Sequence, residues 1–481
     1  MSVVPLFSTR NTPQWLTSTQ CDLRRNVCGQ CKRANLACGG FRDPGQLIIR
    51  DETSATRWKY SGGSWADEEM TLSLGGELRL APQVQARFAF FSHYVFGLSR
   101  SYDVLLPLYQ AAPEDGHLSA GVDAASAAFL AFQEYTPQLL ELAKEKYLAA
   151  ARLLRSALER PEAMASDTTL QTVLLLDLFE KLVNNTPKSS SLWMSHVRGG
   201  VALIKARGFG QFPSYASRRL AARLYVTVII SAAAANARVP DGIEELGRNL
   251  AAHSPNIDPK WLVTGLVVKV VNLRASIADG ALSGGDLIAS TQEIELEFQE
   301  LERSLPPGWE FTRIVVEYDL PGGLGIHYDQ YRDHFVTQVR NVIRTMRLLL
   351  QDTILKQRRR MCDGDDTNSG TQDEILITDS LCRELCSSAP QFVWPERRFT
   401  DRSPFTTLQI LQCYTLLGPL YLAGQLHSNP EVRQWIIGVM RYMAEVGGMW
   451  RAQQVADILE NTPSVAYWDV YTMLGSYALA A

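Results

Sequence analysis

Four of the eight cysteines fall within 18 residues, and their spacing limits what the N-terminal segment can fold into. Two thiolates separated by two residues can chelate one ion from a single turn, and an outer pair can complete a tetrahedral shell. A segment this short cannot bury a hydrophobic core, so metal binding would fold it. The pattern C-x6-C-x2-C-x6-C therefore predicts a metal-binding arm. Its candidate ligands are Cys21, Cys28, Cys31 and Cys38.

The segment around these cysteines is basic. Residues 21–50 contain six Arg or Lys against Asp22 and Asp43, whereas the whole chain has a formal net charge of −4. A cationic end on an otherwise mildly acidic chain is typical of a nucleic-acid contact confined to that end. We expect the cations between the cysteines to contact DNA phosphates. They are Arg24, Arg25, Lys32 and Arg33.

The cysteine pattern, followed by G-G-F-R-D at residues 39–43, resembles the second half of the fungal binuclear zinc cluster. This cluster is the six-cysteine DNA-binding domain of fungal transcription regulators. In that family a further C-x2-C pair comes first, and its two positions hold Asn11 and Gln14 here. The family's base-reading side chains lie in that missing part. The resemblance implies zinc ligation by the four cysteines, with weak and strongly salt-dependent DNA binding by the printed chain.

The four remaining thiols leave three interpretations open. In the family, two zinc ions share six thiolates, so four thiolates can complete one tetrahedral shell at most. The thiols could hold one zinc ion in a rearranged site, or they could be reduced and unliganded in a disordered arm. Alternatively, the natural N-terminus differs from the printed one, and a complete cluster holds two ions. We favour this third interpretation, because the resemblance begins abruptly at Cys21.

The composition indicates a large globular protein. Of 481 residues, 46% are hydrophobic and 20% charged, enough to bury a large core in one or two coupled helical units. Residues 1–20 lack the features of a secretory signal. The other cysteines are scattered, which favours reduced thiols in a nuclear or cytosolic compartment. We expect buried thiols, not a second metal site, at Cys382 and Cys386.

Apolar periodicity predicts helices through most of the chain after residue 85, and hence an all-α fold. Thr136-Pro137 is a helix-start pair, and Asp167 begins a helix with almost no polar face, which we expect to be buried. The apolar run within residues 220–237 is too short to span a bilayer, so it predicts another buried helix. Further helices are predicted over 262–278, 286–304 and 328–360, and a flexible loop over 362–374.

A second resemblance lies in W-M-S-H-V-R-G-G-V-A-L-I-K-A-R-G, from Trp193 to Gly208. It resembles the middle block of the fungal-specific regulatory domain found behind zinc clusters, and three segments near the C-terminus resemble the helices of that domain. We expect Gly199 and Gly200 to let another helix approach closely, and Gly208 to end this helix. His196 is expected to be a hydrogen-bonded packing residue. The segments resembling the C-terminal helices are 386–392, 417–424 and 433–437.

Together the resemblances imply a fungal transcription regulator located in the nucleus. The expected organisation is an unmatched segment over residues 1–20, a partial zinc cluster over 21–43, a linker over 44–84 and an all-helical regulatory domain over 85–481. The expected partners are DNA and the transcription machinery or co-regulators, with no membrane. No enzyme motif such as G-x-S-x-G, H-E-x-x-H or a phosphate-binding loop is present, so we predict no catalytic activity. The alternative is a helical interaction or ligand-sensing regulator that has lost zinc and DNA binding and acts through protein partners.

Overall fold

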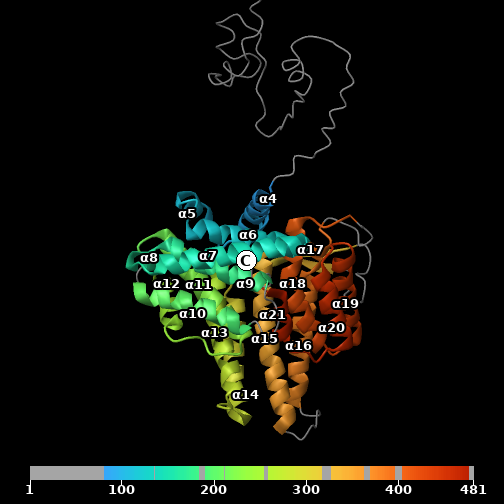
Figure 1. Cartoon of the computed structure of the whole chain (residues 1–481). Coiled ribbons are helices and arrows are strands. Elements are labelled where there is room, and N and C mark those ends of the chain that lie inside the picture. Colours follow the sequence, from blue (N-terminus) through green and yellow to red (C-terminus); the bar gives the residue numbers. More distant parts are fainter. Residues whose placement is uncertain are drawn as a thin grey trace, which may run out of the picture. The chain divides into compact units, whose positions relative to one another are not determined.

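Helices build the part of the chain that the structure describes (Figure 1). In the ranges of this computed structural model, the only strands form one two-stranded hairpin, so the all-α prediction is confirmed. The described ranges are 81–134, 136–183, 190–210, 212–253, 258–316, 327–361, 369–395 and 403–475.

The elements of the first half of this region are α4 (Pro82–Ala89), the π-helix η1 (Phe90–Leu98), α5 (Leu105–Ala111), α6 (His117–Glu134), α7 (Pro137–Leu158), α8 (Pro161–Ala165), α9 (Asp167–Val183), α10 (Ser190–Arg207), α11 (Tyr215–Ala234) and α12 (Ile243–Ala252). Those of the second half are α13 (Pro259–Ala278), α14 (Gly284–Arg303), β1 (Phe311–Val315), β2 (His327–Tyr331), α15 (His334–Met361), α16 (Ser369–Ser388), α17 (Pro390–Val393), α18 (Thr407–Leu426), α19 (Pro430–Glu445), α20 (Trp450–Asn461) and α21 (Tyr467–Leu474).

The N-terminal helices pack around α6, which runs along α7 and α9 (Figure 1). Small buried side chains such as Ala124 and Ala128 let these helices approach closely. The ring of Phe90 on η1 stacks on Tyr94 with 5.5 Å between centroids, and its edge meets Phe129 of α6. The aromatic stretch before residue 98 thus supplies core side chains, although Phe96 faces solvent.

Two predicted helix starts are confirmed. α7 begins at Pro137 with Thr136 at the N-cap position, and Pro fits the first turn because its missing amide has no intrahelical partner there. α9 begins at Asp167 and is buried from Thr169 to Leu182, as its nearly continuous apolar sequence predicts. Local capping and proline signals therefore locate these helices correctly.

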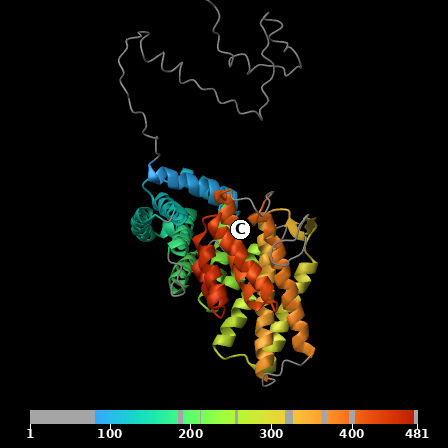
Figure 2. The same ribbon diagram turned by 90° about the vertical axis from the view of Figure 1, so that its right-hand side faces the viewer.

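The C-terminal helices gather around α18, which contacts α15, α16, α19, α20 and α21. Figure 2 shows these orange and red helices beside the yellow helices of the middle of the chain. Pro419 lies inside α18 and has no amide to donate to the carbonyl of Thr415 one turn earlier. The helix therefore has a gap in its hydrogen-bond ladder at its centre.

The predicted helix over residues 328–360 is wrong at its N-terminal end. Residues from His327 to Tyr331 form β2, which pairs antiparallel with β1, and Phe311 lies opposite Tyr331. The helix α15 begins only at His334, because the Asp333 carboxylate accepts the amide hydrogen of Val336 at 2.9 Å and caps the first turn. The residues of β2 thus form a strand by pairing with β1, although their apolar spacing also fits a helix.

The predicted loop over residues 362–374 is wrong from Ser369 onward, where α16 begins. Glu374 lies in the first turns of this helix and is buried, with its Oε1 3.0 Å from Nη2 of Arg358 on α15. This ion pair helps to explain why a polar, acidic segment joins a packed helix.

One described helix, α13, is long and apolar enough to cross a membrane by length and composition alone. The core helices of soluble proteins meet the same criteria. α13 packs against α11, α14 and α15, and Val263, Val268 and Val271 are buried there. These contacts are those of a helix in a protein core.

The two adjacent glycines of α10 have different surroundings. A Cβ atom on Gly200 would lie 2.6 Å from Cδ1 of the fully buried Leu224 on α11, whereas a Cβ atom on Gly199 would meet nothing within 4 Å. The prediction of a close helix approach is therefore confirmed for Gly200 and wrong for Gly199. Gly208 follows the last residue of α10 with a φ of 89°, which confirms its role in ending the helix.

We expect Gly199→Ala to raise the free energy of unfolding by up to about 1 kcal/mol, because alanine stabilises an unobstructed helix position. Gly200→Ala should instead lower it by about 1 kcal/mol or more, because the new methyl group overpacks against Leu224. Urea unfolding of both variants beside the unmodified chain measures the difference. Equal effects of the two substitutions would show that Gly200 does not set the distance between α10 and α11.

Candidate functional site

The residues predicted to bind zinc and DNA lie outside the described part of the chain, so these predictions stay predictions. Within the described ranges, no three His, Cys, Asp or Glu side chains are grouped so that they could hold a metal ion. Cys382, Cys386 and Cys413 are buried free thiols, and burial raises the pKa of each one, which disfavours the metal-binding thiolate. The predicted site outside these ranges consists of Cys21, Cys28, Cys31, Cys38, Arg24, Arg25, Lys32 and Arg33.

His196 on α10 packs between two helices of the N-terminal group. Its Nε2 lies 3.2 Å from the hydroxyl of Tyr147 on α7 and 3.4 Å from Oε1 of Glu180 on α9. The Tyr147 ring stacks on Phe179 with 4.4 Å between centroids. These contacts confirm the prediction that His196 is a hydrogen-bonded packing residue.

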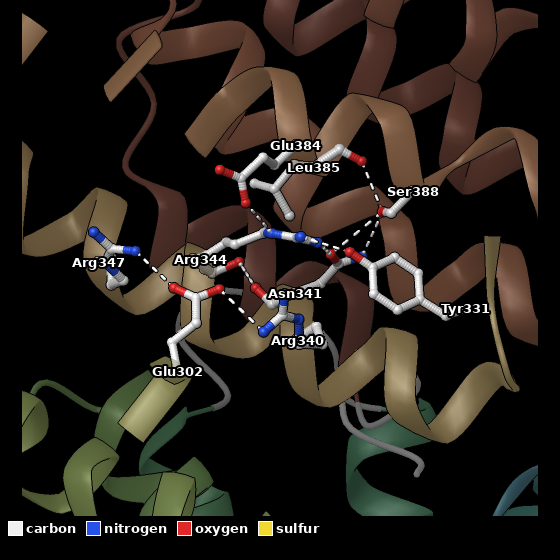
Figure 3. Close-up of polar contacts among 10 residues, drawn as sticks. Glu302, Tyr331, Arg340, Asn341, Arg344, Arg347, Glu384, Leu385 and Ser388 are labelled. Atoms are coloured by element: carbon white, nitrogen blue, oxygen red, sulfur yellow. Dashed lines mark hydrogen bonds and ion pairs between the residues drawn. The ribbon is translucent and has the colours of Figure 1, made fainter. Parts of the chain in front are cut away.

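A buried cation at the centre of α15 organises the polar contacts between the hairpin and the helices of the second half (Figure 3). The side chain of Arg344 is 0% exposed. Its Nε donates to Oε2 of Glu384 on α16 at 3.0 Å, and its Nη2 donates to the Tyr331 hydroxyl at 2.6 Å. Its Nη1 donates to Oδ1 of Asn341 at 3.0 Å, and Nδ2 of Asn341 donates to Oγ of Ser388 at 2.9 Å. One guanidinium group thus joins α15, α16 and β2.

Two further arginines of α15 bind carboxylates of α14. Arg347 donates from Nε to Glu295 at 2.9 Å and from Nη1 to Glu302 at 2.7 Å. Nη1 of Arg340 lies 3.3 Å from the other carboxylate oxygen of Glu302 (Figure 3). Burial raises the pKa of Glu295, and the charge of Arg347 opposes that rise. These pairs fix α14 beside α15.

An apolar cavity of about 100 Å³ lies between five helices, α11, α13, α15, α18 and α21. It adjoins the position of Pro419, where α18 lacks a backbone hydrogen bond. Asn341 of the polar network also lines it. We call this cavity the chamber. Most of its lining is apolar, including Ile229, Val263, Val339, Met346, Pro419 and Trp468.

A second cavity, of about 320 Å³, is lined by cations. We call it the mouth. It lies at the N-terminal ends of α11, α13 and α15, and it includes the carboxylate of Asp258 and the ring of Phe335. Its four cationic side chains are Arg100, Arg219, Arg223 and Lys260.

The cations of the mouth differ in their partners. Arg100 pairs with Asp333 at 2.9 Å, and Arg219 pairs with Asp103 at 2.9 Å. Burial, with the nearby charge of Arg223 as a smaller cause, lowers the pKa of Lys260 to about 7. The site therefore disfavours a further positive charge.

The mouth is not among the predicted sites, although the sequence contains one signal for it. Arg219 and Arg223 are four residues apart on a helix that is otherwise largely apolar, so they share one face. Lys260, which follows Pro259 at the start of α13, gave no such signal. Only the packing of α11 against α13 brings these three side chains to one cavity.

We expect Arg344→Met to lower the free energy of unfolding by about 3 kcal/mol, because it removes a buried charge whose hydrogen-bonded partners then lose their donor. Urea unfolding measures the effect. Arg303→Met is the matched control, since Arg303 pairs with Glu300 where both side chains are exposed, and it should change stability by less than about 0.5 kcal/mol. A similar loss in both variants would contradict the organising role of Arg344.

We compare the free energy of unfolding of the unmodified chain with that of the Lys260→Met variant. We expect the difference, unmodified minus variant, to increase from about pH 7 to about pH 9. The folded-state pKa of Lys260 is about 7 and the unfolded value is about 10.4, so only the unfolded chain holds the proton in this range. Stability that depends on the neutral amine is then lost as the pH falls through about 7. Unfolding by urea across this range tests the sign. The control is Lys269→Met on the same helix, at an exposed lysine that pairs with Glu297.

Comparison with known proteins identifies the family of the helical region. The sequence profile described as fungal specific transcription factor domain matches residues 94–460, from η1 to α20. No curated protein and no solved structure matches the chain. The matched family is one of transcription factors and not a class of enzymes. Because the match spans most of the sequence, the chain belongs to the fungal-specific transcription factor domain family.

Proposed function

We propose that the protein is a nuclear transcription regulator that binds DNA through a zinc-folded N-terminal arm and is controlled by its helical domain. Family membership over residues 94–460 supports the regulatory role. The observation that supports zinc-dependent DNA binding is the cysteine spacing from Cys21 to Cys38, in a basic segment before that domain. A protein that acts on genes would work in the nucleus, with co-regulators or the transcription machinery as partners.

The chemistry of the donor set fits zinc. Four thiolates make up a common structural zinc site, and Cys28 and Cys31 have the two-residue separation of a chelating pair. Bound zinc would replace the hydrophobic core that the arm lacks. We propose one ion at most for the printed sequence, and two for a complete six-cysteine cluster.

The basic residues of the arm would position it on DNA. Arg and Lys side chains neutralise phosphates, and such contacts set the orientation of a protein without reading the base sequence. We propose that they lie in or beside the major groove. The positions of the family's first cysteine pair hold Asn11 and Gln14, so the printed chain should show little sequence preference. The contacting residues would be Arg24, Arg25, Lys32 and Arg33.

The lack of that first cysteine pair also favours a second candidate function. In a chain without a complete binuclear cluster, the helical domain alone would carry the function and would regulate transcription through protein partners. This candidate predicts a stably folded helical protein that retains neither zinc nor DNA.

We expect the purified full-length chain to hold up to one zinc ion and to bind duplex DNA with an affinity that falls steeply with salt. Metal analysis and fluorescence anisotropy measure these two properties. Arg24→Ala with Arg25→Ala should make the slope of log affinity against log salt shallower by about 2, because two phosphate contacts are lost. Cys28→Ser should abolish zinc binding, whereas Cys386→Ala, at a buried thiol of α16, should leave the zinc content unchanged.

Two results would contradict the proposal for the printed chain. A clear preference for one DNA sequence would show that base reading does not need the missing segment. A folded chain with no zinc and no DNA binding at low salt would favour the second candidate function instead.

A further inference from the structure

The chamber and the mouth are neighbouring cavities, because Val226, Lys260 and Thr264 line both of them. Arg100 and Tyr215 at the mouth are exposed, so solutes can reach it from the solvent. A solute entering here meets cations first and apolar side chains further in. Pockets that bind small molecules have this composition, with apolar walls and a few converging polar groups.

Arg223 is the arginine of the mouth that has no ion pair with a described carboxylate. Its Nη2 donates to the hydroxyl of Tyr102 at 3.2 Å, and its guanidinium lies 4.5 Å from the centroid of that ring. Its Nε is buried and has no hydrogen-bond partner. No carboxylate of the described residues forms an ion pair with it, whereas Asp333 and Asp103 pair with the other two arginines. A buried donor without an acceptor is unfavourable, and an anion at this point would supply the acceptor.

The surroundings favour one negative charge and a planar group. Two of the four cations are already paired, and Lys260 lies close to Asp258, whose carboxylate accepts the Lys260 amide hydrogen at 2.9 Å. The charge of Arg223 is left without a carboxylate partner of its own, because Asp177, the carboxylate that raises its pKa, pairs with Lys181 at 2.6 Å. A guanidinium binds a carboxylate through two parallel hydrogen bonds, and a carboxylate carries the single charge that this balance requires.

We propose that this pocket binds a small monocarboxylic acid, with the carboxylate held by Arg223 and Lys260 and an apolar body in the chamber. A cavity of about 150 Å³ suffices to bind benzene, so the chamber and the inner mouth together accept one aromatic ring or a short aliphatic chain. Transfer of that body from water to the chamber would add apolar burial to the ionic contact. The proposal does not depend on zinc or DNA binding, and it gives the helical domain an effector of stated chemistry.

Isothermal titration calorimetry of the full-length chain tests the proposal with named probes. The acids are benzoate, 3-phenylpropanoate and hexanoate, and the uncharged controls are their primary amides. Inorganic phosphate tests an anion without an apolar body. We expect at least one acid to bind at least about tenfold more tightly than its amide and than phosphate.

Substitutions locate the binding site of the tightest acid. Arg223→Met and Lys260→Met should each weaken it at least about tenfold, because each removes a hydrogen-bond donor to the carboxylate. Val342→Phe should weaken it similarly by filling the chamber from α15, and Val267→Phe does the same from α13 if the first variant loses its helical circular dichroism. Arg248→Met, at an exposed arginine of α12 away from the pocket, is the control and should leave the affinity unchanged.

Three outcomes would overturn the proposal. The first is that no acid binds more tightly than its amide. The second is that phosphate binds as tightly as the acids, which would mean that the chamber contributes nothing. The third is that both methionine variants at the mouth, with their helical signal intact, keep the affinity of the unmodified chain.

Discussion

A buried guanidinium group must find an acceptor for its donors in the fold, because arginine cannot lose its charge in a protein. Arg344 meets this condition with acceptors from three elements, the hairpin residue Tyr331, Asn341 of its own helix and Glu384 of α16. Apolar packing is not directional, so it brings these elements together without setting their relative register, that is, the position of each element along its neighbours. The hydrogen bonds of Arg344 set that register, and the order of the second half of the domain depends on it.

The same helix uses neighbouring turns to hold α14. Arg340 and Arg347 lie on either side of Arg344 in sequence and share the carboxylate of Glu302. A carboxylate shared by two arginines is ordered at a lower entropic cost than two separate pairs, since one side chain is immobilised for both contacts. Contacts with α15 therefore position the surrounding helices. The same helix contributes to the walls of both the chamber and the mouth.

The sequence allowed some elements to be predicted and not others, and the difference has a physical basis. The starts of α7 and α9 depend on residues next to them, Thr136-Pro137 and Asp167, so they could be read locally. The hairpin depends on pairing between residues that are distant in sequence, and its second strand has apolar spacing that also fits a helix. The cysteine cluster is predicted by spacing alone, because metal chelation is local. The pocket could not be predicted, because Arg219 and Arg223 of α11 meet Lys260 of α13 and Arg100 only through packing.

Asn341 belongs to two structures at once, since its side chain bonds Arg344 and Ser388 and also lines the chamber. A residue that is shared in this way links the free energies of both. By thermodynamic reciprocity, the free energy by which an intact network favours binding in the chamber equals the free energy by which a bound molecule stabilises the network. Such a link would carry information from the interior of the domain to the packing of α16 and the hairpin without any contact between a bound molecule and those elements.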